Sequence, residues 1–542
     1  MVSEINSKLP SIIVTGASGF VGRHFLEVIK DKYNIFAIAR RSQSEAAIPF
    51  HHNIHWIQCD IGSWARVKEV INLIKENGGA DYILHLAAFY DFEYTDKKEY
   101  ENTNVKGTQY ILDMAKSLKI KRFIFASSLA ACNFPPKGKV VNEKTKPDAN
   151  FAYAKSKKAG EKLVEEYSKD FPCTVTRFAA IFSDWCEYPP LYKFLSTWLA
   201  KKWDSRILGG KGESAVSYIH VHDVNKFLLT VLKKSKSLPE FDIYNVSPNG
   251  SVSHKELYKT STLYFFGQEI KPIYFPKSLT YPGLFVRNCI LANLHIIKKP
   301  FEKFWMLKYV DIKLNVDSSY TFERISWAPT SRYHIKRRLL FIIEKMKSHP
   351  EEWHVKNEIV LKRITERPNL IIYDHLIANK DKLIEKLTNH ILDSENDNFT
   401  KFRSMKNVNL QFYINVLYHL LLAAVRSGDR GLMVENIDDI INQKFAEGFE
   451  PDEISKTFTA YKEIIVHELI NNKELKVNKQ DINDSISLTI QLVQDGIEDI
   501  YENLDKKIPS ENVLNYELMP DSEELQRKVR QLSAFYQIFR KN

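Results

Sequence analysis

The sequence predicts an α/β fold, a doubly wound parallel sheet with a small second lobe, followed by an all-α bundle. In the first part of the chain, short apolar runs alternate with helix-length segments whose apolar residues recur every three to four positions. After residue 350 the pattern is helical, with almost no alternating β-branched runs. The length of 542 residues exceeds what one hydrophobic core usually serves. We therefore expect a sheet domain over residues 1–345, with its lobe at about 180–215 and 250–330, and a helical domain over 350–542.

Six buried strands are expected in the first domain. They are placed at residues 12–15, 35–39, 54–59, 82–87, 123–127 and 174–178. Continuous apolar strands that are separated by crossover helices indicate a parallel sheet with both faces covered. A ligand of such a sheet binds at the carboxyl ends of the strands, where the strand order reverses.

A glycine-rich turn follows the first strand. Gly16, Gly19 and Gly22 lie three apart in the segment 15–22, which opens into an apolar-faced helix. A strand, a glycine turn and a helix N-terminus form a cradle for a pyrophosphate, because the unpaired N–H groups and the helix dipole favour an anion. We therefore predict a Rossmann-type dinucleotide site. Its expected contacts in this loop are Thr15, Gly16, Ser18, Gly19, Phe20, Val21 and Gly22.

The end of the second strand bears on the choice of dinucleotide. An acidic residue there would hold the ribose hydroxyls of NAD, whereas arginine pairs with the 2′-phosphate of NADP. Ala39 occupies the acidic position, and Arg40 and Arg41 follow it. NADP is therefore favoured over NAD. Asp60 and Ile61, after the third strand, are expected to hold the adenine ring.

A tyrosine and a lysine four residues apart carry the predicted chemistry. Tyr153 and Lys157 share one face of an amphipathic helix that follows the strand ending at Ser127 and Ser128. The Lys157 ammonium is expected to lower the phenol pKa of Tyr153 and so to make a proton donor usable near neutral pH. The Ser128 hydroxyl can reach the same substrate carbonyl.

Together these motifs resemble the extended short-chain dehydrogenases/reductases over about the first 345 residues. This family includes nucleotide-sugar epimerases and dehydratases, 3β-hydroxysteroid dehydrogenases and dihydroflavonol reductases. The motifs are the glycine loop, Asp60-Ile61, His85-Leu86-Ala87-Ala88, Asn104-Val105-Lys106-Gly107-Thr108, Ser127-Ser128, Tyr153/Lys157, Arg177, Tyr218–Val224, Tyr244–Ser247 and Ser326–Pro329. The resemblance implies an enzyme that transfers a hydride between a nicotinamide and a carbinol or carbonyl carbon.

The resemblance also assigns roles to single residues. It implies that Ser128 binds the substrate oxygen, that Tyr153 exchanges its proton, and that Lys157 holds the nicotinamide ribose. Asn104 would support the active-site helix. Leu86, Ala87 and Ala88 would line the cofactor cleft.

The substrate segments depart from the nucleotide-sugar members of this family. Those members usually carry V-Y-G after the catalytic serine and an asparagine after the sixth strand, whereas residues 129–133 read LAACN and the segment 177–185 has no asparagine. Aromatic residues are frequent in the lobe instead, which suits an apolar substrate or a structural cap equally well. The expected substrate contacts are Phe89, Ala130, Phe182, Trp185 and Tyr192.

The helical domain contains no catalytic constellation in its sequence. A long apolar helix ends near Gly428, and Pro451 starts another after Phe449. The region weakly resembles the helical sensor modules of stressosome-type regulators. A last helix after Asp521 carries one apolar stripe, for which packing on the bundle and contact with a second copy are both open.

Composition and single-residue patterns bear on nucleic-acid binding, cellular location and metal binding. A net charge of +10 spread over this length does not indicate a nucleic-acid protein. Five scattered cysteines and the absence of a signal-like N-terminus predict a cytoplasmic protein, and no apolar run reaches the length of a membrane span. Residues 281–310 are interpreted as a substrate-side lid, with contact to a membrane surface as the alternative. No metal site is predicted at His51, His52 and His55, because His55 is expected to enter a strand that His51 and His52 precede, so the three side chains would not converge, and a solvated loop is the expected setting of this stretch.

Three functions remain open. The first is an NADP-dependent oxidoreductase that acts on a largely apolar small molecule, with the helical domain as a regulatory or oligomerisation module. Its enzymatic alternative is a nucleotide-sugar epimerase or dehydratase. The alternative from another class is a dinucleotide-sensing regulator. Retention of Ser128, Tyr153 and Lys157 favours an enzyme.

Overall fold

A computed structural model describes residues 9–505 apart from 44–45, 92–95, 201, 203, 287–302, 366–367, 394–398, 429, 473–474 and 476. Its contacts divide the chain into two compact units. Unit 1 comprises Met1–Ala39, Gln43–Ile57 and Val67–Glu366, and unit 2 comprises Arg40–Ser42, Gln58–Arg66 and Arg367–Asn542. Each unit is described by itself.

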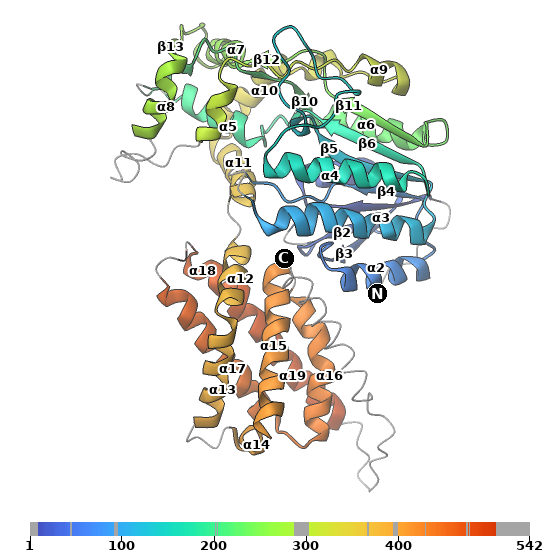
Figure 1. The fold of residues 1–542 in the computed structure, drawn as a ribbon, viewed down its shortest axis with the longest axis vertical. Coiled ribbons are helices and arrows are strands. Elements are labelled where there is room, and N and C mark those ends of the chain that lie inside the picture. Colours follow the sequence, from blue (N-terminus) through green and yellow to red (C-terminus); the bar gives the residue numbers. More distant parts are fainter. Residues whose placement is uncertain are drawn as a thin grey trace. The chain divides into compact units, whose positions relative to one another are not determined.

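Unit 1 is built on a seven-stranded parallel sheet (Figure 1). The strand order is β11-β6-β5-β4-β1-β2-β3, so the chain runs outward from β1 on one side and returns to β4 on the other. The strands are β1 (Ser11–Thr15), β2 (Asn34–Ala39), β3 (Ile54–Gln58), β4 (Tyr82–His85), β5 (Arg122–Ser128), β6 (Cys173–Phe178) and β11 (Phe241–Val246). This order confirms the predicted doubly wound sheet, and its reversal lies between β1 and β4.

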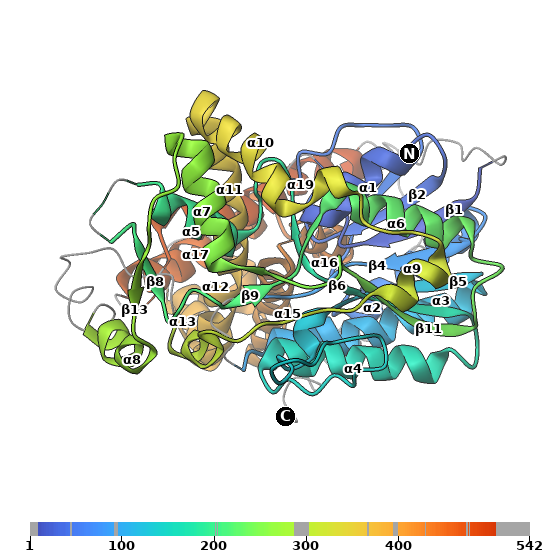
Figure 2. The ribbon, with the colours of Figure 1, turned by 90° about the horizontal axis from the view of Figure 1, so that it is seen from above.

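Helices cover both faces of the sheet, which explains why its strands are apolar on both sides. The side chains of Ile12, Ile13 and Val14 in β1 are fully buried. Helices α1 (Phe20–Ile29) and α6 (Val221–Lys233) lie on one face, and α3 (Gly107–Leu118) and α4 (Ala152–Tyr167) lie on the other (Figure 2). Helix α2 (Trp64–Glu76) connects β3 to β4.

The second lobe of unit 1 collects short strands and helices from the later part of the chain. They are β7 (Ala180–Phe182), α5 (Pro189–Trp198), β8 (Ile207–Gly209), β9 (Ala215–Val216), β10 (Tyr218–His220), β12 (Val252–Ser253), α7 (His254–Phe266), β13 (Ile273–Phe275), α8 (Lys277–Phe285), α9 (Ser319–Ile325), α10 (Ile335–Ser348) and α11 (Pro350–Thr365). One apolar core joins Tyr192 of α5, Leu339 of α10 and Trp353 of α11. Helix α11 therefore packs within unit 1, although the sequence places it at the start of the second domain.

Unit 2 is a bundle of helices, as the sequence predicts. They are α12 (Pro368–Ala378), α13 (Lys380–Asp393), α14 (Thr400–Ser404), α15 (Asn407–Ser427), α16 (Gly431–Ala446), α17 (Pro451–Asn471), α18 (Lys479–Ile482) and α19 (Leu488–Asp505). Their apolar faces share one core that includes Leu383, Leu417 and Ile465. Helix α15 ends at Gly428, whose φ of +70° suits a glycine cap. The helix predicted after Asp521 lies outside the described residues.

Within the described part of the chain, no helix is long and apolar enough to cross a bilayer. The predicted lid at 281–310 is described only at its two ends, where α8 and the 3₁₀-helix Phe304–Tyr309 lie.

Candidate active site

The glycine turn between β1 and α1 leaves no room for side chains. Gly16 has a φ of +69°, and a Cβ atom there would lie 2.7 Å from the backbone nitrogen of Ala87. A Cβ atom on Gly22 would clash with the carbonyl oxygens of Gly16 and Ala17. Gly19 is the N-cap of α1, and the first turn of this helix contains no acidic residue. The turn therefore keeps its backbone open to an anion at the helix N-terminus.

A buried histidine of β4, His85, links that strand to the end of β1, where the turn begins. His85 Nδ1 lies 2.7 Å from Thr15 Oγ1, and His85 Nε2 lies 3.0 Å from Thr108 Oγ1. Burial, with Lys157 as a second cause, lowers the pKa of His85 to about 3. The imidazole is therefore neutral at physiological pH, and it fixes the turn against β4 and α3. The backbone nitrogen of Ala87 also donates to Thr15 Oγ1, at 3.3 Å.

The remaining predicted cofactor contacts lie at or near the same ends of the strands. Ser18, Phe20, Val21, Leu86 and Ala88 are half-buried or exposed and lie within the glycine turn, at the start of α1 or directly after β4. Ala39 ends β2, so no carboxylate stands at the end of this strand, and Arg40 and Arg41 follow directly.

Asp60 and Ile61 are both buried, and both belong to unit 2. The Asp60 carboxylate accepts a hydrogen bond from the Gly62 nitrogen at 3.0 Å and forms an ion pair with Arg426. Burial alone would raise its pKa, but the charges of Arg426 and Arg40 outweigh burial and hold it below the usual range. Asp60 is therefore ionised, and its oxygens already have partners. Its predicted contact with an adenine ring stays a prediction.

Ser128, Tyr153 and Lys157 converge at the carboxyl end of β5. Ser128 ends this strand, and its hydroxyl forms a hydrogen bond with the Tyr153 side chain. Lys157 is buried, and its Nζ donates to the carbonyl oxygen of Ala126 at 2.6 Å. The same Nζ lies 5.8 Å from the centre of the Tyr153 ring. The tyrosine, the serine and the lysine thus form one cluster beside the strand that precedes them.

The expected effect of Lys157 on Tyr153 is wrong for this geometry. Burial raises the pKa of Tyr153 to about 12, against a smaller opposing effect of the Ser128 hydrogen bond. The ammonium points at Ala126 rather than at the phenol oxygen, so it does not offset the burial. Burial also lowers the pKa of Lys157 to about 8, against the attraction of Glu161. At neutral pH Tyr153 therefore starts as a protonated phenol.

Asn104 braces the start of the helix that carries Tyr153. It lies in a π-helical turn, Tyr100–Lys106, and its Oδ1 accepts from the Phe89 nitrogen at 2.6 Å. Its Nδ2 donates to the Phe89 oxygen at 2.9 Å and to Ser156 Oγ at 2.9 Å. Ser156 in turn donates to the carbonyl oxygen of Tyr153. Asn104 therefore connects the segment after β4 to α4.

A buried ion pair behind Lys157 was not predicted as part of the site. Glu161 accepts from Arg177 Nε at 3.0 Å, from Arg177 Nη2 at 2.7 Å and from Ser127 Oγ at 2.5 Å. Arg177 is 1% exposed. The sequence spacing could have indicated that Glu161 belongs to the site, because Glu161 follows Lys157 by four residues and so shares its helix face. Arg177 stood among the family motifs without an assigned partner.

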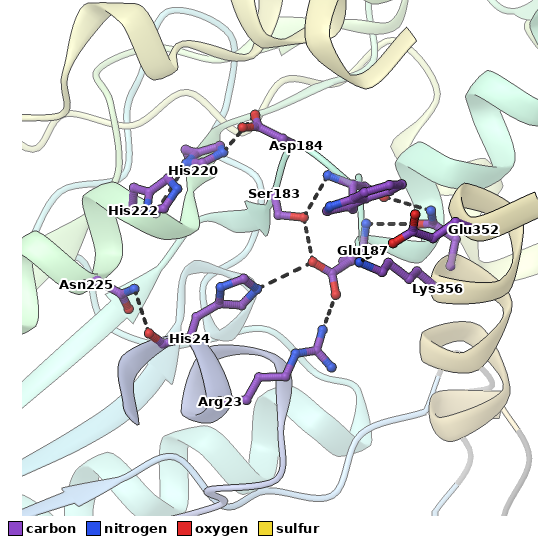
Figure 3. A network of polar contacts seen from close by, with 12 residues as sticks. Arg23, His24, Ser183, Asp184, Glu187, His220, His222, Asn225, Glu352 and Lys356 are labelled. Atoms are coloured by element: carbon purple, nitrogen blue, oxygen red, sulfur yellow. Dashed lines mark hydrogen bonds and ion pairs between the residues drawn. The ribbon is translucent and has the colours of Figure 1, made fainter. Parts of the chain in front are cut away.

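A second polar network, which sequence reasoning also missed, joins the lobe to the helix of the glycine turn (Figure 3). The buried carboxylate of Glu187 contacts Arg23 and His24 of α1 and accepts from Ser183 Oγ at 2.6 Å. Burial raises its pKa, but these partners outweigh burial and hold the pKa below its usual range. Both Glu187 and the preceding Cys186 have a positive φ, which costs free energy in residues other than glycine. The ion pairs hold this strained turn against α1.

The predicted substrate contacts divide into buried and half-buried residues. Phe89, Phe182 and Tyr192 are each no more than 1% exposed. Tyr192 donates to Glu358 Oε1 at 2.8 Å, and its ring packs on Trp353. Phe182 and Tyr192 belong to the core that α10 and α11 complete, and Phe89 packs edge to face on Tyr100 outside the lobe. These side chains are core residues and not ligand-facing walls.

The other two predicted contacts keep some exposed surface. The half-buried Trp185 ring lies between the ammonium groups of Lys345 and Lys356, at 4.2 and 4.1 Å. Ala130 is half-buried, and its nitrogen donates to Ser128 Oγ at 3.1 Å. A further aromatic residue, Tyr90, packs edge to face on Tyr153 with a centroid distance of 4.7 Å. Of the side chains of Trp185, Ala130 and Tyr90, that of Tyr90 contacts the cluster of Ser128, Tyr153 and Lys157, through the Tyr153 ring.

The paired histidines of β10 and α6 have a structural explanation. His220 is the N-cap of α6: its Nδ1 accepts from the His222 nitrogen, and its Nε2 lies 3.2 Å from Asp184. Within the described ranges, no group of three or more His, Cys, Asp or Glu residues is placed to hold a metal ion.

Comparison with known sequences identifies the region that carries this cluster. Residues 12–247 match the model of the NAD dependent epimerase/dehydratase family. Human dTDP-D-glucose 4,6-dehydratase is 26% identical over 262 residues, which cover 46% of this chain and 72% of the human protein. A 3β-hydroxysteroid dehydrogenase/Δ5→4-isomerase of monkeypox virus is 33% identical over 160 residues, or 28% of this chain and 44% of the viral one.

Solved structures resemble the chain over about two thirds of its length. A UDP-glucose 4-epimerase of Thermotoga maritima aligns with a TM-score of 0.48 and 18% identity, covering 63% of this chain and 100% of the epimerase. A dTDP-glucose 4,6-dehydratase of Bacillus anthracis in complex with NAD aligns with a TM-score of 0.48 and 19% identity, covering 64% and 99%.

Proposed function

Residues 12–247 belong to the NAD dependent epimerase/dehydratase family, a family of NAD(P)-dependent enzymes, and from this we propose a reaction for the chain. It oxidises a carbinol carbon of a nucleotide-activated sugar and reduces the carbonyl that results. The observation that carries the proposal is the cluster of Ser128, Tyr153 and Lys157 beside the glycine turn. The prediction of a largely apolar substrate is not retained as the main proposal. The relatives support its nucleotide-sugar alternative better.

The glycine turn fits a dinucleotide. A side chain at Gly16 would clash with the backbone of Leu86 and Ala87, and one at Gly22 would clash with the carbonyl oxygens of Gly16 and Ala17, so the tight turn at the N-terminus of α1 requires glycine at both positions. We assign to Lys157 the binding of the nicotinamide ribose, and to Leu86, Ala87 and Ala88 the lining of the cofactor cleft. When bound, the nicotinamide supplies hydride acceptance and donation.

The residues of the cluster handle the proton. Tyr153 is protonated at neutral pH and donates to a substrate carbonyl oxygen, which the Ser128 hydroxyl also binds. In the opposite direction the phenolate receives the proton of the carbinol hydroxyl. The Lys157 ammonium stabilises that phenolate once it turns from the Ala126 carbonyl toward the ring, from which it now lies 5.8 Å away.

Two observations favour a sugar over an apolar substrate. The aromatic residues expected to form apolar walls, Phe182 and Tyr192, are buried in the core of the lobe. The human relative is named for a nucleotide sugar over the same region. Loss of the family's nucleotide-binding asparagine implies that the base is held by other residues of the lobe.

Epimerisation fits the site better than dehydration. Elimination of water from a sugar needs an additional acid or base beside the reacting carbons. The residues after Ser128 are Leu129, Ala130 and Ala131, and none of them can titrate. A reaction that needs only oxidation followed by reduction requires no group beyond Ser128, Tyr153 and Lys157.

We further propose NADP as the preferred cofactor, because Ala39 stands where a carboxylate would repel the 2′-phosphate and Arg40 and Arg41 follow it. Titration of the protein with NADPH and NADH tests this preference. Equal affinity for both would contradict it.

Product analysis tests the substrate class. The protein, loaded with NAD(P), is incubated with UDP- and dTDP-hexoses, and the anomeric proton signals of the sugars are followed by nuclear magnetic resonance. The proposal expects conversion of one hexose into its epimer without net consumption of cofactor. Turnover only on an apolar ketone, with consumption of NADPH, would support the apolar alternative. Tight cofactor binding with no turnover on any substrate would support the dinucleotide sensor.

A further inference from the structure

We propose that the exposed face of β13 and α8 binds the surface of an anionic lipid bilayer. The proposal does not rest on the enzymatic function, since this face contains none of the residues assigned to the active site. It rests on three observations: a concentration of exposed apolar side chains, lysines around them, and a position at the edge of unit 1.

Exposed apolar side chains concentrate in this short segment. Among the described residues, twenty large apolar side chains are exposed, and six of them lie within residues 273–286. These six, here called the apolar patch, are Ile273, Tyr274, Leu279, Tyr281, Phe285 and Val286. Tyr281 is the most exposed of them, at 62%. Such a concentration in fourteen consecutive residues suggests an interaction surface, whereas apolar residues exposed singly need no explanation.

The patch extends to a second segment through an aromatic contact. The Tyr281 ring lies 5.1 Å from the ring of Phe304, which is itself exposed. On the inner side, Leu284 is buried, and Gly283 lies against the ring of Phe275. Helix α8 thus anchors one side in unit 1 and presents tyrosine and phenylalanine outward, the residue types that favour the boundary between headgroups and acyl chains.

Three lysines lie near the patch, and two described carboxylates in the same region accept hydrogen bonds or form an ion pair. Lys271, Lys277 and Lys308 are exposed at its borders. Asp311 accepts hydrogen bonds from the backbone nitrogens of Lys211 and Glu213. Glu269 forms an ion pair with Lys259 at 3.3 Å. Glu269 and Lys259 neutralise each other, whereas Asp311 keeps its negative charge. The three lysines outnumber Asp311, so the described part of this face carries a net positive charge that suits phosphatidylserine or other anionic headgroups.

This charge argues against a second copy of the chain as the occupant. A two-fold interface would bring the same lysines of both copies together around the apolar centre, and like charges there would oppose association. In both views β13 and α8 lie at the edge of unit 1, away from the seven-stranded sheet (Figures 1 and 2). A flat partner can reach the face without contacting the sheet.

Vesicle sedimentation tests the proposal with the full-length protein. The probes are large unilamellar vesicles of phosphatidylcholine alone and of an equimolar mixture of phosphatidylcholine and phosphatidylserine. We expect the protein to sediment with the mixed vesicles and much less with the neutral ones. Reversal of two border charges, Lys271→Glu with Lys308→Glu, is expected to weaken binding by more than about 30-fold. Loss of the two lysines alone removes about 1 kcal/mol each near such a surface, and the added carboxylates are repelled.

Matched variants separate the patch from general surface effects. Tyr281→Ser with Phe285→Ser removes the apolar centre and is expected to abolish sedimentation. Phe412→Ser, at a residue of similar exposure in unit 2, and Lys169→Glu with Lys236→Glu, elsewhere on unit 1, are expected to bind like the parent protein. Far-ultraviolet circular dichroism and cofactor binding verify that each variant is folded.

Three results would overturn the proposal. The first is no sedimentation of the parent protein with either vesicle. The second is equal sedimentation of the patch variants and the control variants. The third is a change from dimer to monomer in the patch variants by analytical ultracentrifugation without lipid, which would assign the patch to self-association.

Discussion

Neutralising Glu161 tests the buried ion pair behind the active site. In Glu161→Gln the Arg177 guanidinium keeps its bond to the Thr145 carbonyl oxygen at 2.7 Å but loses its anionic partner. Because Arg177 is 1% exposed, water cannot replace the carboxylate. Removing one partner of a buried pair costs about 3–5 kcal/mol of the free energy of unfolding. We expect a loss of this size.

The same change should alter the pH dependence of turnover. Burial lowers the pKa of Lys157 to about 8, and Glu161 opposes this shift. Without the carboxylate, the pKa of Lys157 falls further. If the ammonium is the working form, activity is present below this pKa and lost as pH rises through it. The alkaline limb of the profile of kcat/KM should therefore move to lower pH in Glu161→Gln.

Urea unfolding, followed by circular dichroism, measures the first effect, and the pH profile measures the second. Asp170→Asn is the matched control, because it neutralises a carboxylate paired with Lys116 at 2.8 Å where both side chains are exposed. Such a surface pair is worth about 0–1 kcal/mol. Equal destabilisation of the two variants, together with an unmoved alkaline limb in Glu161→Gln, would refute the reasoning.

Three further predictions follow from the same geometry. Gly22→Ala should abolish cofactor binding measured by fluorescence titration, because its Cβ atom would clash with the Gly16 carbonyl, whereas Gly496→Ala, with open space in α19, should bind normally and gain about 0.5–1 kcal/mol of stability. His85 has a folded pKa of about 3, below its unfolded value, so its neutral form contributes stability that is lost as pH falls from about 6.5 toward 3, by up to about 1.4 kcal/mol per pH unit; an identical pH slope of the unfolding free energy in His85→Gln would contradict this. Arg40→Ala should weaken NADPH binding about tenfold, the value of one hydrogen bond to a charged group, and leave NADH binding unchanged; equal weakening of both would remove Arg40 from the 2′-phosphate site.

The sheet could be predicted from the sequence because its signals are local. Each expected strand matches an observed one to within two residues at either end: for example, the run at 35–39 became Asn34–Ala39. Apolar continuity, the glycine spacing and helix periodicity all depend on near neighbours in the chain. Tyr153 and Lys157 were likewise predicted to share a helix face from their spacing and from their position after the strand that ends at Ser128.

The errors arose where residues far apart in the chain meet. Tyr192 was expected to face a substrate, but it contacts Glu358, which lies 166 positions later in the chain, on a helix assigned to the other domain. The Glu187 network joins the turn after β7 to α1 across a similar sequence separation, and no local motif predicts it. The pKa of Tyr153 depends on burial, which sequence spacing does not give.

The central claim is that Tyr153 is the proton-transfer residue of an NAD(P)-dependent carbinol oxidation. The most direct measurement compares the parent protein with Tyr153→Phe, with Tyr90→Phe as the control for the neighbouring ring, which lies 4.7 Å away. Formation of the epimer from a nucleotide hexose is followed by the anomeric proton signals of the sugars, and cofactor affinity is measured separately. We predict that Tyr153→Phe binds cofactor normally but loses turnover, while Tyr90→Phe retains it. Unchanged turnover in Tyr153→Phe would contradict the assignment.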